Sequence, residues 1–177
     1  LDHGSDGARE LRGKNRIGLW VKLLALGLAR PDTRWQGILV GTDHRPRDKG
    51  SQPGPLMLRL SLPENPGQVL SRILELYDRG MRQPLPLYCD TSAAYADAVR
   101  FANPHKRMAN TWVTGFDSPK EDQDAYNLRV LDPMPTVEDL LADPQFVACG
   151  HELWDDLLAH EQVLSQAQLE ADQAVAP

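Results

Sequence analysis

Cysteine, long apolar runs and export signals are scarce or missing in this sequence. Its 177 residues include only two cysteines, Cys89 and Cys149, which are far apart and lack the spacing of a metal site. We expect both to be free thiols in a reducing cytosol. No run approaches the roughly 18 apolar residues that a membrane span needs, and the first residues do not resemble a signal peptide. We therefore expect a cytoplasmic protein without a membrane partner, and the missing initiator Met suggests a fragment of a larger chain.

The motifs of several enzyme classes are also missing. Neither the phosphate-binding loop GxxxxGK[ST] nor the dinucleotide motif GxGxxG occurs, so the chain is not expected to be an ATPase by itself. It has no GxSxG elbow, and its cysteines lack the flanking residues of thiol enzymes. His151 and Glu152 begin a His-Glu-x-x-His pattern, but Asp155 stands where the second His belongs. His160 is no substitute, because positions 151 and 160 of a helix point about 180° apart.

An acidic run could in principle bind a metal ion. Glu121, Asp122 and Asp124 follow Lys120, and carboxylates are the protein ligands that Mg²⁺ prefers. A metal-dependent nuclease also needs convergent carboxylates on a rigid sheet, and nothing in the sequence places this run on a strand. We therefore predict a solvated acidic loop and no metal site.

The net charge of −6 is divided unevenly along the chain. Residues 1–112 carry 17 Lys and Arg against 11 Asp and Glu, whereas residues 113–177 carry 2 against 14. Such a split favours one face that binds polyanions or acidic partners and another that repels them. Two differently solvated faces would explain the same split.

Basic residues form three groups that could neutralise phosphates and make binding depend on salt. No known DNA-binding signature lies among them, so solvated surface or protein contact remains an alternative to DNA contact. The candidate DNA- or partner-contact residues are Arg12, Lys14, Arg16, Arg45, Arg47 and Lys49. Further basic residues are Arg9, Arg100, His105, Lys106 and Arg107.

Hydrophobic periodicity and turn signals predict an α/β (α+β) fold. We expect helices over 15–29, from Pro66 to Met81, over 92–102, over 136–142 and from about 150 to 172. Strands are expected over 35–42 and 56–60, joined as a hairpin. Asp90 or Thr91 should cap the helix over 92–102, and Thr136 with Asp139 the helix over 136–142. Residues 84–89 should be extended, and 103–135 irregular with Trp112 and Phe116 as anchors.

Several of these landmarks together resemble the C-terminal domain of the exodeoxyribonuclease V gamma subunit (RecC). The resemblance covers roughly residues 12–162. It rests on RGKNRIGLWVKLLAL (12–26), Trp35 at the start of a strand, LSRILELYDRGMRQPLPL (70–87), Ser92 with Tyr95, Asp124 with Tyr126, and Leu153-Trp154 before Leu157-Leu158. Two positions depart from the family pattern: Ile17 replaces Leu, and Asp156 replaces Pro.

The resemblance implies a degenerate restriction-endonuclease-like (PD-(D/E)xK-like) core without catalytic residues. Helices would flank a small mixed sheet truncated at its N-terminal side, in a single domain over 1–177 with frayed tails at 1–11 and 165–177. The implied function is that of a non-catalytic domain of an ATP-dependent helicase–nuclease in double-strand-break repair and recombination. Its partners would be DNA and the helicase/nuclease subunits of a heterotrimer, which would also use the ATP and Mg²⁺. No cofactor is expected in this chain.

Two other interpretations stay open at this stage. The chain could belong to a Mg²⁺-dependent nuclease domain whose catalytic strands lie outside it, and Asp and Glu-x-Lys just upstream in the parent would favour that reading. It could also be a stand-alone α/β protein that binds a small molecule. Whether the chain is part of an enzyme is therefore left undecided by its residues alone.

Overall fold

The computed structural model describes residues 11–43, 54–99, 103–115 and 119–164. The chain divides into two compact units. One, the sheet unit, comprises Leu1–Gly67 with His160–Pro177, and the other, the helical unit, comprises Gln68–Ala159. The tails predicted at 1–11 and 165–177 lie outside the described residues except for Leu11, whose side chain is buried. The single domain stays a prediction.

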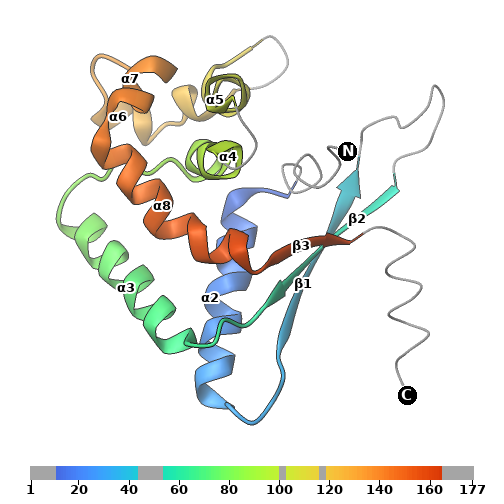
Figure 1. Ribbon diagram of the computed structural model, residues 1–177. Coiled ribbons are helices and arrows are strands. Elements are labelled where there is room, and N and C mark those ends of the chain that lie inside the picture. Colours follow the sequence, from blue (N-terminus) through green and yellow to red (C-terminus); the bar gives the residue numbers. More distant parts are fainter. Residues whose placement is uncertain (1–10, 44–53, 100–102, 116–118, 165–177) are drawn as a thin grey trace. The chain divides into compact units, whose positions relative to one another are not determined.

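The sheet unit contains a three-stranded sheet in the order β1-β2-β3 (Figure 1). Its strands are β1 (Gln36–Asp43), β2 (Gly54–Ser61) and β3 (Glu161–Leu164). The predicted β1–β2 hairpin is confirmed, with Leu39 opposite Leu58. The prediction of a mixed sheet is wrong for the described strands, because β3 also pairs antiparallel to β2.

Helix α2 (Gly13–Ala29) packs against the hairpin in the sheet unit. Gly37 and Gly41 of β1 lie next to leucine side chains, and a Cβ added at Gly37 would lie 3.0 Å from Leu19 Cγ. Without a side chain at Gly37, α2 approaches the strand closely. Gly41 leaves room for Leu11, which precedes the helix. The same face carries the buried Leu58 of β2. The predicted helix over 15–29 is thus confirmed, with one side against the sheet.

The helical unit is built from six α-helices and one 3-10 turn among its described residues. They are α3 (Pro66–Arg82, which begins in the sheet unit), α4 (Cys89–Val99), α5 (Pro104–Trp112), η1 (Glu121–Gln123), α6 (Asn127–Val130), α7 (Val137–Ala142) and α8 (Pro144–Ala159). The helix predicted from Pro66 is confirmed. So is the capping box of α7, in which Thr136 and Asp139 exchange hydrogen bonds.

The core of the helical unit joins several residues that carried the family resemblance. Trp154 of α8 is fully buried and donates its indole N–H to Ser92 Oγ of α4 over 2.9 Å. Trp112 is also buried, as predicted, and donates to the Pro135 carbonyl over 2.8 Å. Around them lie Tyr88, Tyr95, Met108, Val137, Leu140 and Phe146. Small side chains along α4 allow the aromatic rings to pack closely.

Three boundaries differ from the sequence prediction. The helix expected over 150–172 ends at Ala159, and residues 161–164 form β3. Helix α4 begins at Cys89, so Asp90 and Thr91 both lie in its first turn and neither is its cap. The segment expected to be irregular contains α5. This helix starts after Asn103, which has a left-handed backbone conformation (φ 79°), and the Asn103 side chain accepts a hydrogen bond from the Lys106 N–H. Phe116 lies outside the described residues.

Candidate interaction surfaces

Each carboxylate of the acidic run accepts hydrogen bonds from backbone N–H groups. Glu121 accepts from the N–H groups of Asp90 (3.0 Å) and Thr91 (2.7 Å) in the first turn of α4, where a side-chain acceptor caps the helix. Asp122 accepts from the Thr114 N–H over 2.9 Å. Asp124 accepts from the Tyr126 N–H over 2.9 Å. The predicted solvated loop is therefore corrected for Glu121 and Asp122, which are half-buried and bind backbone N–H groups, whereas Asp124 is exposed as predicted.

The cap on α4 makes Glu121 the source of a measurable pH dependence. Burial raises the pKa of Glu121 above its ordinary value of 4.5, although the N–H groups of Asp90 and Thr91 oppose that shift. Between 4.5 and the raised pKa, the folded chain holds a proton that the unfolded chain has released, so this carboxyl group contributes less stability as pH rises.

We predict that Glu121→Gln flattens the stability profile in that pH window. The measurement is the free energy of unfolding of both proteins by urea between pH 4 and 7. Glu121→Ala should cost about 1–3 kcal/mol at pH 7, because it leaves two N–H groups without an acceptor. A difference between wild type and Glu121→Gln that does not change with pH would contradict the assignment.

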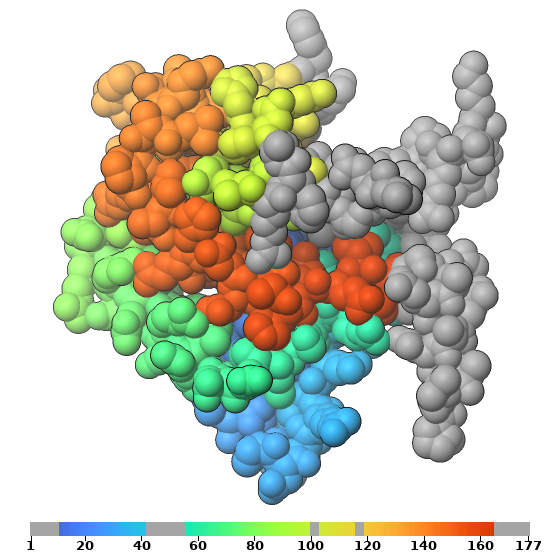
Figure 2. All heavy atoms as spheres, viewed as in Figure 1, coloured from blue at the N-terminus to red at the C-terminus, as the bar shows by residue number. Residues whose placement is uncertain are grey.

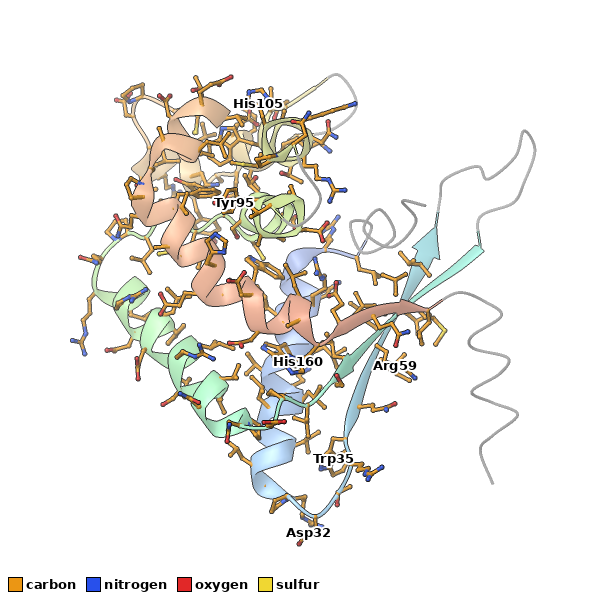
Figure 3. The ribbon with its side chains drawn as sticks, viewed as in Figure 1. Asp32, Trp35, Arg59, Tyr95, His105 and His160 are labelled. Atoms are coloured by element: carbon orange, nitrogen blue, oxygen red, sulfur yellow. The ribbon has the colours of Figure 1, made fainter. Side chains whose placement is uncertain are left out.

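A second polar network connects α4 with α8. The Tyr95 hydroxyl lies 3.4 Å from His151 Nε2, and His151 Nδ1 lies 3.1 Å from both oxygens of Asp155. Figure 3 shows Tyr95 directed from α4 toward α8. Burial raises the pKa of the Tyr95 phenol. In the neutral tautomer whose Nδ1–H donates to Asp155, Nε2 accepts the hydrogen bond from the Tyr95 hydroxyl. These hydrogen bonds account for the position of His151 by helix packing, so no catalytic or metal-binding role is required to explain it.

The other two residues considered as metal ligands, Glu152 and His160, contact different partners. Glu152 Oε2 accepts from Arg79 over 2.6 Å, and the His160 ring stacks on Trp20 with 5.7 Å between the ring centroids. Among the described residues, no group of three or more His, Cys, Asp or Glu side chains could hold a metal ion. In the same part of the chain, no helix is both long and apolar enough to cross a membrane.

The basic residues at the start of α2 fall into two kinds. Arg12 and Lys14 are exposed. Arg16 is only 4% exposed and forms a two-pronged ion pair with Glu161 of β3, with Nε–Oε2 at 2.8 Å and Nη2–Oε1 at 2.7 Å. The guanidinium of Arg16 therefore holds α2 to the sheet. That Arg16 contacts DNA or a partner stays a prediction, and its burial does not favour it. Arg45, Arg47 and Lys49 lie outside the described residues.

The basic residues after α4 are mostly paired with carboxylates. Arg107 Nη1 lies 2.7 Å from Asp97 Oδ2, with both side chains largely buried. His105 Nε2 lies 2.6 Å from Glu138 Oε1. Lys106 is exposed, and Arg100 lies outside the described residues. The described part of this group therefore offers little free positive charge.

Helix α3 exposes a strip of apolar side chains. The strip consists of Leu70, Leu74, Tyr77 and Met81, of which the last three are 55%, 65% and 69% exposed. In the space-filling view α3 lies at the surface beside α8 (Figure 2). Only Val69 and Leu76 of this helix are buried. Helix α3 is amphipathic, and nothing in the described helical unit covers most of its apolar strip.

Two ion pairs hold the opposite side of α3 to α8. Arg72 binds Asp156, and Arg79 binds Glu152, each over 2.6 Å. At roughly 100° per residue, both arginines lie about 180° around the helix from the α3 strip. The strip therefore faces away from α8.

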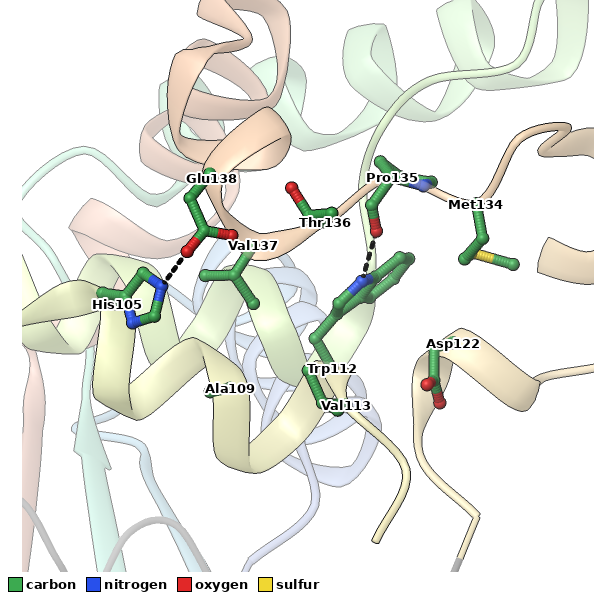
Figure 4. A pocket seen from close by; sticks show the side chains of 10 residues that line it. All are labelled: His105, Ala109, Trp112, Val113, Asp122, Met134, Pro135, Thr136, Val137 and Glu138. Atoms are coloured by element: carbon green, nitrogen blue, oxygen red, sulfur yellow. Dashed lines mark hydrogen bonds and ion pairs between the residues drawn. The ribbon is translucent and has the colours of Figure 1, made fainter.

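A pocket of about 410 Å³ lies between α5 and the segment that leads into α7 (Figure 4). It is lined by His105, Ala109, Trp112, Val113, Asp122, Met134, Pro135, Thr136, Val137 and Glu138. Most of this lining is apolar, and Asp122 and Glu138 lie at opposite ends of the view. The hydrogen bond from His105 holds the pKa of Glu138 below its usual value. The sequence did not predict this pocket. The one local signal near it is Asn103-Pro104, a recognisable start for α5, which forms one of its walls.

Comparison with known proteins agrees with the resemblance. A family model described as the RecC C-terminal domain matches residues 5–100. A protein named RecBCD enzyme subunit RecC from Mycolicibacterium smegmatis is 37% identical over 92 residues, which cover 50% of this chain and 8% of that protein. A protein of the same name from Mycobacterium tuberculosis (strain H37Rv) is 28% identical over 165 residues, covering 86% of this chain and 14% of the relative.

The chain thus spans between 8% and 14% of the length of these curated relatives. No solved structure matches it. The α3 strip and Ser92 of the core both fall within the residues that the family model matches. The match covers more than half of the sequence, and the chain therefore belongs to the RecC C-terminal domain family.

Proposed function

We propose that this chain is a non-catalytic domain of the gamma subunit of an ATP-dependent helicase–nuclease (exodeoxyribonuclease V) that acts in double-strand-break repair and recombination. Its share is subunit assembly and the guidance of separated DNA strands in the cytoplasm. The observation that carries the proposal is the exposure of Tyr77 and Met81, at 65% and 69%. Both belong to the segment that most closely resembles the family, and core packing does not explain them.

The spacing of the α3 strip suits a helical partner. Leu70, Leu74, Tyr77 and Met81 follow one another at intervals of four, three and four residues, which is the spacing of a coiled-coil seam. An amphipathic helix from another subunit would bury the strip side chains. Large apolar side chains, with Tyr among them, are the residues that most often dominate binding energy at such contacts.

The α2–β1–β2 arrangement bears on the fold family and on where the chemistry takes place. We propose that the α2–β1–β2 arrangement is the remnant of a PD-(D/E)xK-like core, supported by the packed, apolar surface of α2 at Leu19, Trp20 and Leu23. ATP and Mg²⁺ would act in the helicase/nuclease subunits of a heterotrimer. Because this chain spans so little of its relatives, those activities belong to parts outside it.

The assembly role is tested in the full-length parent subunit. Tyr77→Asp combined with Met81→Asp should lower the recovery of partner subunits about tenfold or more in co-purification, since the loss of central interface residues typically weakens binding this much. The matched control is Gln68→Asp with Ser71→Asp, two exposed polar positions of α3 outside the strip. Equal recovery with both variants would refute the assembly role.

The strand-guidance role is tested with single-stranded DNA and the 177-residue chain. Arg12→Ala with Lys14→Ala should lower the slope of log affinity against log salt by about one for each phosphate that is no longer neutralised, measured by fluorescence anisotropy. The control, Lys22→Ala with Arg34→Ala, removes the same charge at other exposed positions. A third variant changes Arg45, Arg47 and Lys49 to Ala. If every variant keeps the wild-type slope, these residues do not bind phosphates.

A further inference from the structure

The pocket beside α5 combines an apolar floor with negative charge at its rim. Trp112 and Val137 form part of the floor, and both also belong to the hydrophobic core of the helical unit. Ala109, Val113 and Met134 extend the apolar lining. A side chain that enters the pocket therefore contacts the outer surface of the core. Its volume, about 410 Å³, is large enough for one long side chain with its flanking backbone.

Charge selects among the side chains that could enter. The two segments that line the pocket, residues 103–115 and 119–143, carry seven Asp and Glu against four Lys and Arg, a net charge of −3. Asp122 and Glu138 line the pocket itself. Asp122 is bonded to Thr114 and Glu138 to His105, and a carboxylate has room for further donors. An anionic group, including a DNA phosphate, would be repelled here, whereas a cation would be attracted.

The walls are held in place before any ligand arrives. The Trp112 indole N–H is bonded to the Pro135 carbonyl over 2.8 Å, which fixes the loop across the pocket (Figure 4). The capping box between Thr136 and Asp139 fixes the start of α7. Asp122 is fixed by its bonds to Thr114. A preformed site loses little conformational freedom on binding.

We propose that this pocket receives an arginine or lysine side chain from a partner polypeptide. The aliphatic stem would lie along Ala109, Val113 and Met134, and the charged head would bind the carboxylate of Glu138. Arginine suits the site best, because its weakly hydrated guanidinium binds carboxylates through two parallel bonds and its stem packs on apolar surface. The pocket is separate from the α3 strip, and the inference does not depend on the assembly role of that strip.

The test compares three peptides that differ at one position. Acetyl-Gly-Ser-X-Ser-Gly-amide, with X as arginine, citrulline or glutamate, is titrated into the ¹⁵N-labelled 177-residue chain in low salt. Citrulline keeps the shape of arginine without its charge. We expect the arginine peptide to shift the Trp112 indole and Val113 amide signals, with at least about fivefold tighter binding than the citrulline peptide. The glutamate peptide should leave both signals unchanged.

Substitutions then test which carboxylate binds the arginine and whether the apolar lining is needed. Glu138→Gln should reduce the preference for arginine over citrulline about threefold or more, whereas Glu75→Gln, an equal charge change at an exposed position of α3, should leave it unchanged. Ala109→Phe should fill the floor and abolish binding of both peptides. Thermal unfolding confirms that each variant is folded.

The proposal is overturned if arginine and citrulline bind equally, or if the signals that shift lie away from the pocket. The doubly substituted Tyr77→Asp, Met81→Asp chain separates this proposal from the assembly role. It should bind the arginine peptide as the wild type does, even though it fails to recover partner subunits.

Discussion

Replacing Trp154 with Ala is expected to lower the free energy of unfolding by about 3–5 kcal/mol, the usual cost of removing a large aromatic side chain from a core. Trp154 is fully buried, so the substitution leaves a cavity beneath α4. It also removes the donor to Ser92 Oγ, a hydroxyl that is itself buried. Both effects act at the same place, where α4 and α8 pack together.

Tyr126 provides the matched control for Trp154. It is another aromatic landmark of the family resemblance, but its side chain is 77% exposed. Tyr126→Ala should change the free energy of unfolding by no more than about 0.5 kcal/mol, as exposed substitutions usually do. Urea unfolding followed by circular dichroism measures both variants. Similar destabilisation by Trp154→Ala and Tyr126→Ala would contradict the placement of these two side chains.

Arg16→Ala is expected to have an effect of similar size, about 3–5 kcal/mol, because it leaves the Glu161 carboxylate buried without its partner. The two side chains are only 4% and 7% exposed, and both prongs of the guanidinium are bonded. This pair ties α2 to β3, through two residues 145 positions apart in sequence. Replacing both residues with Met should restore much of the stability, since an apolar pair of similar volume leaves no buried charge unpaired.

Lys14 tests whether the Arg16 effect arises from burial or simply from the removal of positive charge. Lys14 is exposed on the same helix, so Lys14→Ala should change stability by no more than about 0.5 kcal/mol. Equilibrium unfolding of both single variants and of the Met double variant gives the comparison. If Arg16→Ala and Lys14→Ala are equally mild, the buried ion pair does not exist as described.

Local signals in the sequence predicted the elements that local forces specify. Pro66 at the first turn predicts the start of α3, and Thr136 with Asp139 predicts the cap of α7. The β-branched and apolar residues around Leu39 and Leu58 predict the hairpin. The start of α3 and the cap of α7 are each specified by residues within a few positions. The sequence therefore sufficed to place them.

The errors arose where a distant segment decides the structure. Residues 161–164 form a strand because β2 offers a partner about 100 residues earlier in the chain, and nothing near Val163 indicates that pairing. Glu121 resembles a solvated acid until its carboxylate is found on the first turn of α4. Helix α5 is different, because Asn103-Pro104 is a local start signal that the sequence-based prediction did not use.

The candidate surfaces were the least predictable part. The pattern of Leu74, Tyr77 and Met81 predicts an amphipathic helix correctly, but a periodic pattern does not state whether a partner lies inside or outside the chain. Arg16 illustrates the same difficulty with charge, because a basic residue in a cluster suggests a phosphate contact until its burial against Glu161 is known. Family resemblance identified the chain, whereas geometry separated exposed landmarks from buried ones.

The most direct measurement of the assembly role is the nuclease activity of reconstituted complexes, expressed per assembled complex. The full-length subunit carrying Tyr77→Asp and Met81→Asp is mixed with its partner subunits, the assembled fraction is isolated by size-exclusion chromatography, and cleavage of linear DNA is measured in it with ATP and Mg²⁺. We predict that the assembled fraction falls about tenfold while the activity of each complex that does form stays at the wild-type level. Full assembly without activity would contradict the account, because it would place the α3 strip in the chemistry and not in assembly.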